Sequence, residues 1–167
     1  MRILKQISVL VVLCAITISC GVYSFTGANT NAKSVQINFF PNNAPLVEPT
    51  LSQEFTLALQ DLFLSQTNLS LVKTGGELVI DGEITGYRIT PMSATANQTA
   101  AQNRLTITVN VRFYNTLDEN DDFERNFSFF YDYPADRQLV GSTLADAYQV
   151  IFERITQDIF NATVAKW

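Results

Sequence analysis

The sequence predicts an α+β fold in which two helices pack on one face of a four-stranded sheet, in the order β-α-β-β-β-α. Apolar residues recur at helical spacing in two segments and alternate with polar residues in four others. The twelve phenylalanines and six tyrosines also favour a compact, sheet-rich body. Because two amphipathic helices can cover one side of such a sheet, we expect a two-layer sandwich with a mixed, mostly antiparallel sheet.

The predicted first strand begins at residue 34. Val35, Ile37 and Phe39 alternate with polar residues, which is the two-residue period of a strand with one buried face. Two prolines within residues 41–45 end the pattern. The sequence does not determine the position of this strand in the sheet.

Two helices are predicted, over residues 50–66 and 141–165. Each carries apolar side chains at intervals of three and four residues, which is typical of a helix that packs on a sheet. The apolar stripes are Leu51, Phe55, Ala58, Leu59, Leu62 and Phe63 in the first helix and Leu144, Ala147, Tyr148, Ile151, Ile155 and Ile159 in the second.

The other three strands, at residues 78–90, 105–114 and 123–133, are predicted to form a meander. The middle strand alternates without interruption, as in an antiparallel sheet with one buried and one solvated face. In the first of the three, Gly82 and Gly86 indicate a bulge or the close approach of a neighbouring segment. The segments between the predicted elements include an extended piece at residues 69–72, a loop at 91–103 and an acidic turn at 115–122.

The N-terminus predicts export and lipidation. Arg2 and Lys5 precede an apolar run of about a dozen residues, shorter than the roughly 20 that span a bilayer. Ser19 then lies directly before Cys20. A charged start, an apolar stretch and a small residue before the cleavage site describe a secretory signal. A cysteine just after that site is the acceptor of a bacterial lipid anchor, although an ordinary signal peptide with a stray cysteine is the alternative.

The predicted organisation follows from this N-terminus. It consists of a lipoprotein signal peptide at residues 1–19, a lipidated cysteine with its tether at residues 20–33, and a single α/β sandwich domain at residues 34–167.

The charge of the mature chain argues against a nucleic-acid partner. Removal of residues 1–19 takes away Arg2 and Lys5 but no acidic residue, which leaves 9 basic residues against 16 acidic ones and a formal charge of −7. Nucleic-acid binding requires a basic face.

The sequence shows no sign of catalysis, and we expect a protein that is not an enzyme and holds no metal or cofactor. Without histidine, the chain lacks the usual general base and the commonest metal ligand. It also has no nucleophile elbow, phosphate-binding loop, paired-cysteine motif or dinucleotide fingerprint. Asp81 and Glu83 share one strand face, but no nucleophile accompanies them. The acidic turn lacks the ligand spacing of an EF-hand.

Three aromatic residues are candidates for contact with a partner. If the alternation holds, Tyr87, Tyr114 and Phe130 point away from the helices, among threonines and asparagines. Exposed aromatics among short polar groups are typical of protein–protein contacts. The alternative is that these side chains cover their neighbours, or that a register slip misplaces one of them.

Four basic residues are candidates for contact with the phosphates of a lipid. They are Lys73, Arg88, Arg104 and Arg112. An arginine fork matches the oxygens of a phosphate. The alternative is that all four are ordinary solvated surface positions.

The two ends of the mature chain resemble a known family. Cys20 followed by GVYSFTG, and the ending QDIFNATVAKW at residues 157–167, are similar to the LptE lipopolysaccharide-assembly lipoproteins of Bacteroidetes. The predicted order of helices and strands also fits that family. The resemblance spans the whole mature chain.

This resemblance implies a periplasm-facing role in the inner leaflet of the outer membrane, held by a lipid anchor. Members of the family pair with a large LptD-like β-barrel, which they plug and help to assemble while lipopolysaccharide passes to the cell surface. The negative charge favours binding to the barrel over direct binding to lipopolysaccharide. Two other functions stay open: a periplasmic lipoprotein that binds a lipid or small ligand between sheet and helices, and a pilot or adaptor for another envelope machine.

Overall fold

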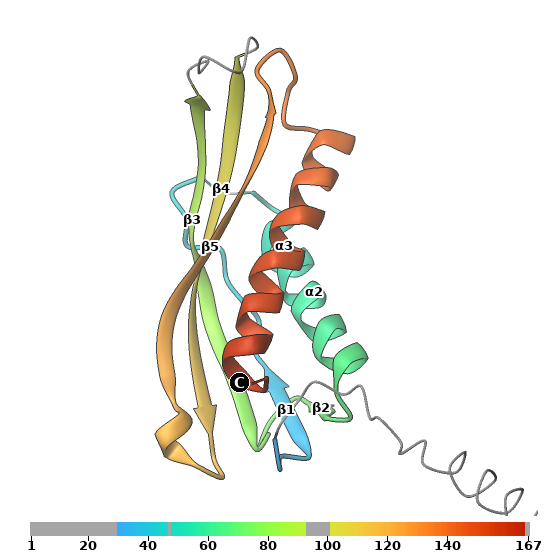
Figure 1. Ribbon diagram of the computed structural model, residues 1–167, viewed down its shortest axis with the longest axis vertical. Coiled ribbons are helices and arrows are strands. Elements are labelled where there is room, and N and C mark those ends of the chain that lie inside the picture. The colour runs from blue at the N-terminus through green and yellow to red at the C-terminus, as the bar shows by residue number, and fades with distance from the viewer. Residues whose placement is uncertain (1–29, 47, 93–100, 166–167) are drawn as a thin grey trace, which may run out of the picture.

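The computed structural model describes residues 30–46, 48–92 and 101–165, and Figure 1 shows two helices on one side of a long, twisted sheet. In chain order the elements are β1 (Ser34–Ile37), α2 (Leu51–Gln66), β2 (Ser70–Val72), β3 (Leu78–Met92), β4 (Gln102–Asn115), the 3-10 helix η1 (Glu119–Asp121), β5 (Phe123–Pro134) and α3 (Ser142–Thr163). The α+β class and the two helices on one face are confirmed. The predicted signal peptide and Cys20 lie outside the described residues.

The sheet has five strands in the order β2-β1-β3-β4-β5, so the prediction of four strands is wrong. β1 runs parallel to both of its neighbours, and β3, β4 and β5 form the predicted antiparallel meander. The added strand is β2, which pairs with β1 from Ser70 to Val72. Three residues are too few for an alternating pattern, so the sequence marked this segment only as extended.

The long hairpin of β3 and β4 is a second correction. The loop predicted at residues 91–103 is shorter than expected, because β3 continues to Met92 and β4 begins at Gln102. Thr90, Pro91 and Met92 pair with residues of β4 although their sequence lacks a clear alternation. Residues 93–100 lie outside the described part of the chain.

β1 is shorter than predicted, and Phe40 rather than Phe39 enters the core. Phe39 is 61% exposed, whereas Phe40 is fully buried. After Ile37 the chain leaves the regular ladder, and the Phe40 N–H donates to Thr56 Oγ1 on α2 at 3.1 Å. This hydrogen bond holds the backbone of Phe40 against α2, with its side chain in the core.

The core fills the space between the helices and the sheet. The predicted stripes of both helices face it, with Leu51, Phe55, Leu59 and Phe63 of α2 fully buried. Phenylalanine rings bridge the two helices at edge-on angles, with centroids 5.5 Å apart for Phe55 and Phe152. Edge-to-face contacts of this kind add to the free energy gained by burying the rings.

A β-bulge divides β3 into two halves. Ile84 pairs with Val109 and Gly86 pairs with Thr108, so Thr85 is an extra residue without a partner across the ladder. Because side chains alternate between the two faces, one extra residue reverses which residues beyond it face the helices. The bulge beside Gly86 confirms one part of the prediction made from the glycines. The close approach of a neighbour is confirmed at Gly82, where an added Cβ would lie only 2.5 Å from Cε1 of the Phe40 ring.

Candidate functional site

The candidate site is the sheet surface turned away from α2 and α3, which we call the open face (Figure 1). No helix or strand of the described residues covers it. It is formed by the residues that alternate with the helix-facing ones on the three long strands. These are Val79, Asp81, Glu83, Arg88, Thr90, Arg104, Thr106, Thr108, Asn110, Arg112, Tyr114, Glu124, Asn126, Ser128, Phe130 and Asp132.

One charged cluster on the open face joins β3 to β4. Arg112 Nη2 donates to Asp81 Oδ2 at 2.8 Å, and Arg112 Nη1 donates to Glu83 Oε1 at 3.4 Å. The three side chains are about one-third exposed or less. The hydrogen bond to Asp81 raises the pKa of the Arg112 guanidinium. The two carboxylates therefore serve as partners of an arginine, which gives no support to a role as catalytic acids.

A second cluster joins β4 to β5. Arg104 binds Asp132 with two parallel hydrogen bonds, Nε to Oδ1 at 2.7 Å and Nη2 to Oδ2 at 2.8 Å. These bonds raise the pKa of the Arg104 guanidinium, whose carbon also lies 3.6 Å from the centre of the Phe130 ring. A guanidinium in this position gains from a cation–π contact in addition to its ion pair.

Uncharged polar side chains connect the strands between these two clusters. Thr108 Oγ1 and Ser128 Oγ lie 3.0 Å apart, and Asn110 Nδ2 donates to Asn126 Oδ1 at 3.2 Å. Short side chains keep this part of the surface flat, and their remaining hydrogen-bonding capacity faces solvent.

Two of the three aromatic candidates lie on the open face and one does not. Tyr114 and Phe130 are 45% and 40% exposed, as predicted. The expectation that Tyr87 points outward is wrong, because it is only 6% exposed and belongs to the core beneath the helices. The extra residue Thr85 places Tyr87 on the helix side. Gly82 and Gly86 indicated the bulge but not which residue is extra.

The basic candidates are not gathered into one phosphate-binding cluster. Arg104 and Arg112 are held by carboxylates of the same face. Arg88 is exposed and forms no ion pair within the described structure, and Lys73 is exposed just beyond β2 at the far edge of the sheet. Sequence reasoning missed both ion-pair clusters, because they depend on the register between strands.

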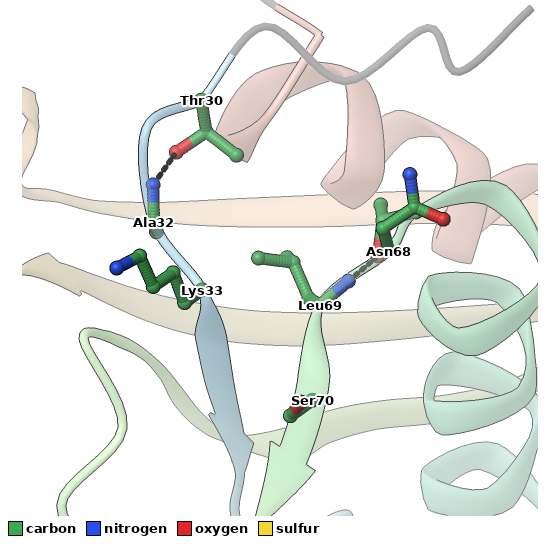
Figure 2. Close-up of a pocket in the computed structure, with 7 residues that line it drawn as sticks. Thr30, Ala32, Lys33, Asn68, Leu69 and Ser70 are labelled. Atoms are coloured by element: carbon green, nitrogen blue, oxygen red, sulfur yellow. Dashed lines mark hydrogen bonds between the residues drawn. The ribbon is translucent and has the colours of Figure 1, made fainter.

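A surface hollow of about 450 Å³ lies where β1 and β2 begin (Figure 2). Two hydrogen bonds within its lining are local: the Ala32 N–H donates to Thr30 Oγ1 at 3.2 Å, and the Leu69 N–H donates to Thr67 Oγ1 at 3.1 Å. A third joins the two strands, because the Ser70 N–H donates to Lys33 O at 2.9 Å. Lys33, Asn68 and Ser70 complete the lining. The space between sheet and helices is occupied by phenylalanine rings, which gives no support to a ligand site there.

The described residues offer little for catalysis or metal binding. They contain no group of three or more cysteine, aspartate or glutamate side chains that could hold a metal ion.

Neither described helix has the length and apolarity needed to cross a bilayer. The fold is a scaffold of two helices on a sheet whose other face is left uncovered by the described helices and strands.

Comparison with known proteins identifies the family of this scaffold. The model of the family "LptE: Lipopolysaccharide-assembly" matches residues 32–163, which is most of the chain. The chain therefore belongs to the LptE family, whose members are non-enzymatic lipopolysaccharide-assembly lipoproteins. No curated protein matches the chain.

Several solved structures are similar to this chain at low sequence identity. A hypothetical protein from Chlamydia trachomatis has a TM-score of 0.54 and 14% identity, covering 81% of this chain and 100% of that one. A minor lipoprotein from Acinetobacter baumannii has a TM-score of 0.47 and 13% identity, covering 77% and 89%. For rare lipoprotein B from Shewanella oneidensis the TM-score is 0.44 and the identity 12%, covering 76% and 89%.

Proposed function

We propose that this protein is an outer-membrane lipoprotein that pairs with a large LptD-like β-barrel and plugs its lumen through the open face. Lipidation of Cys20 holds it in the inner leaflet, facing the periplasm. In this role the protein supports lipopolysaccharide transport by its shape and by the partner it binds. Direct contact with lipopolysaccharide is secondary, because two of the four candidate cations are already bound by carboxylates.

The observation that carries this proposal is the combination of paired charges and exposed aromatics on an uncovered sheet face. The inner wall of a wide β-barrel is polar. A surface that enters such a lumen needs hydrogen-bonding groups, and any ion buried there without a partner would be costly. Arg104 and Arg112 bring their own carboxylates, so this part of the open face can be buried against a polar wall without leaving those cations unpaired.

The exposed aromatics supply the anchors of such a contact. Tyr114 lies on β4 opposite Val79, and Phe130 lies on β5 opposite Thr106, so the two are well separated along the open face. Aromatic side chains are enriched at the centres of protein interfaces and commonly dominate the binding energy. Between them the surface is flat and polar, which suits a contact that extends over several strands.

Photo-crosslinking in cells tests which face meets the barrel. A benzoylphenylalanine is placed at Tyr114 or Phe130 on the open face, and at Leu57 or Val150 on the helices as matched controls. All four positions are between 40% and 48% exposed. We expect the open-face positions to crosslink to a large β-barrel and the helix positions to do so far less. Equal crosslinking from both faces would contradict the assignment of the face, and crosslinking to a secretin would instead support the pilot function.

Alanine substitutions test the contribution of the anchors. The double variant Tyr114→Ala/Phe130→Ala should retain its melting temperature but lose at least tenfold in co-purification with the barrel. The control Leu57→Ala/Val150→Ala should bind normally. Unchanged co-purification of the open-face variant would rule out these residues as anchors.

Mass spectrometry of the N-terminal peptide tests the anchor separately. An acylated Cys20, and release of the Cys20→Ser variant from the outer-membrane fraction, are the expected results. An unmodified N-terminus in the wild-type protein would refute lipidation.

A further inference from the structure

The surroundings of β3 change along its length. In its first half a neighbouring segment lies on the edge away from β4: the Asn38 N–H donates to Ile80 O, and the Asn43 N–H donates to Ile84 O, both at 2.9 Å. After Asn43 the chain turns towards α2, and among the described residues no segment pairs with this edge of β3 beyond Ile84. Figure 1 shows the upper part of β3 at the border of the sheet.

The hydrogen bonds of Ile84 show which backbone groups face this free edge. Its N–H donates to Pro41 O and its C=O accepts from Asn43, so both groups point away from β4. Because Thr85 is an extra residue, the alternation resumes with Gly86 facing β4 and Tyr87 facing the edge. The N–H and C=O groups of Tyr87 and Ile89 therefore point outward.

Pro91 fits the same alternation. A proline has no N–H and is tolerated in a strand where that position faces away from the ladder. Pro91 occupies the next outward position after Ile89, so it ends the row of outward donors after two residues. The free edge thus offers a short backbone template, which we define as residues 87–91.

An apolar hollow of about 410 Å³ lies beside this template. Pro45 and Leu46 line it from the loop before α2, and residues 85–88 line it from β3. Leu46 is 51% exposed and Ile89 is 41% exposed. Exposed apolar residues beside unpaired strand groups form the kind of surface that natural sheets usually protect.

Arg88 adds a charge to the same template, where it also lines the hollow. It is exposed and forms no ion pair with any described residue, unlike Arg104 and Arg112. An acidic group on an incoming strand could therefore bind Arg88 without first breaking an existing pair.

The other two edges of the sheet are less suited to accepting a strand. β2 is only three residues long. The cation of β5, Arg125, already lies over aromatic rings, 4.5 Å from the centre of the Phe127 ring. α3 also packs along β5.

We propose that the free edge of β3 binds an extended segment of another protein by strand addition. The backbone of that segment pairs with Tyr87 and Ile89. One apolar side chain enters the hollow beside Leu46 and Pro45, and an acidic side chain binds Arg88. The main-chain hydrogen bonds supply affinity in a contact of this kind, and the two side-chain contacts supply specificity. The proposal does not depend on the identity of the protein that supplies the segment.

The test uses synthetic nine-residue peptides of alternating valine and threonine with one central aspartate, and a control peptide with lysine in its place. Binding to the full protein is followed by NMR and by amide hydrogen exchange. We expect saturable binding, slower exchange at Tyr87 and Ile89 by at least tenfold at saturation, and at least tenfold weaker binding of the lysine peptide. Equal affinities, or no saturable binding, would overturn the proposal.

Variants separate the charge contact from the backbone contact. Arg88→Glu should reverse the preference to the lysine peptide, whereas the control Arg137→Glu, at an exposed position in the loop after β5, should leave it unchanged. Ile89→Pro removes one outward N–H and should weaken both peptides, provided that its spectrum shows a folded protein. If the Tyr87 and Ile89 amides become protected without peptide as the protein concentration rises, the occupant is a second copy of this chain and the proposal is wrong.

Discussion

The two faces of the same three strands differ in how their side chains are packed. Phe113 and Tyr114 are neighbours on β4, yet the first is completely buried and the second is 45% exposed. On the helix side, rings and aliphatic side chains fill the space beneath α2 and α3. On the open face, polar groups and paired charges leave the aromatics accessible. The comparison teaches that the packed side and the proposed contact surface are separated by a single residue step along the strand, so that substitutions should affect one without the other.

The largest expected effect is the difference between these two neighbours. Phe113→Ala should lower the free energy of unfolding by about 3–5 kcal/mol, because it leaves a cavity in the core. Tyr114→Ala should change it by only about 0.5 kcal/mol, as is usual for surface substitutions. Urea unfolding of both variants measures the difference. Similar losses would show that the open face also carries the stability of the fold.

Two glycines on β3 give a second contrast. A Cβ at Gly82 would meet Phe40 and the Asn110 carbonyl, whereas the tightest contact of a Cβ at Gly86 would be 3.1 Å, with Thr108 Cβ. Gly82→Ala should therefore cost about 1–3 kcal/mol from overpacking, and Gly86→Ala should cost clearly less. Thermal unfolding ranks the two variants. A larger loss for Gly86→Ala would mean that the bulge is more tightly constrained than the core contact.

Alkaline pH should lower the free energy of unfolding through two tyrosines on the buried side of the sheet. Burial raises the pKa of both Tyr87 and Tyr148 above the ordinary value of 10.0. Above that pH the unfolded chain releases these protons while the folded protein keeps them, so stability is full below pH 10 and falls as the pH rises further. The slope is at most about 1.4 kcal/mol per pH unit for each tyrosine. Urea unfolding at a series of pH values should show that the free energy of unfolding falls less steeply with pH for Tyr148→Phe than for the wild type. An unchanged slope would exclude Tyr148 as a source of the pH dependence.

The smallest expected effect concerns the paired charges of the open face. Arg112→Ala should cost less than about 1 kcal/mol, because the pair with Asp81 is partly exposed. Salt should reduce the difference from wild type by screening. Arg154→Ala on α3, which removes a more exposed pair with Asp158, serves as the control and should cost less still. A loss of several kcal/mol for Arg112→Ala would show that the open face stabilises the fold as well.

The regular parts of this fold could be predicted from the sequence, and the irregular parts could not. β4 alternates from Leu105 to Tyr114 without a bulge, so its two faces were assigned correctly. The pattern does not predict β2, because three residues carry no period. It predicts that Phe39 enters the core instead of Phe40, because the exit from β1 involves a hydrogen bond to α2 that no local pattern reveals.

The candidate site shows the same division. The alternation correctly predicts that Tyr114 and Phe130 lie on the open face, because β4 and β5 pair without interruption. It predicts the wrong face for Tyr87, because the glycines indicate a bulge but do not say which residue is extra. The arginine clusters depend on which residues stand opposite one another in adjacent strands, and a single sequence does not fix that register.

The bulge at Thr85 also affects how this chain should be aligned with its relatives. In a homologue without the additional residue, the strand would need a one-position gap here. Without that gap, an alignment would equate the buried Tyr87 with a solvent-facing position and shift every column up to Met92. Conservation scores computed from such columns would then mix packing constraints with surface constraints over the stretch where the free edge lies.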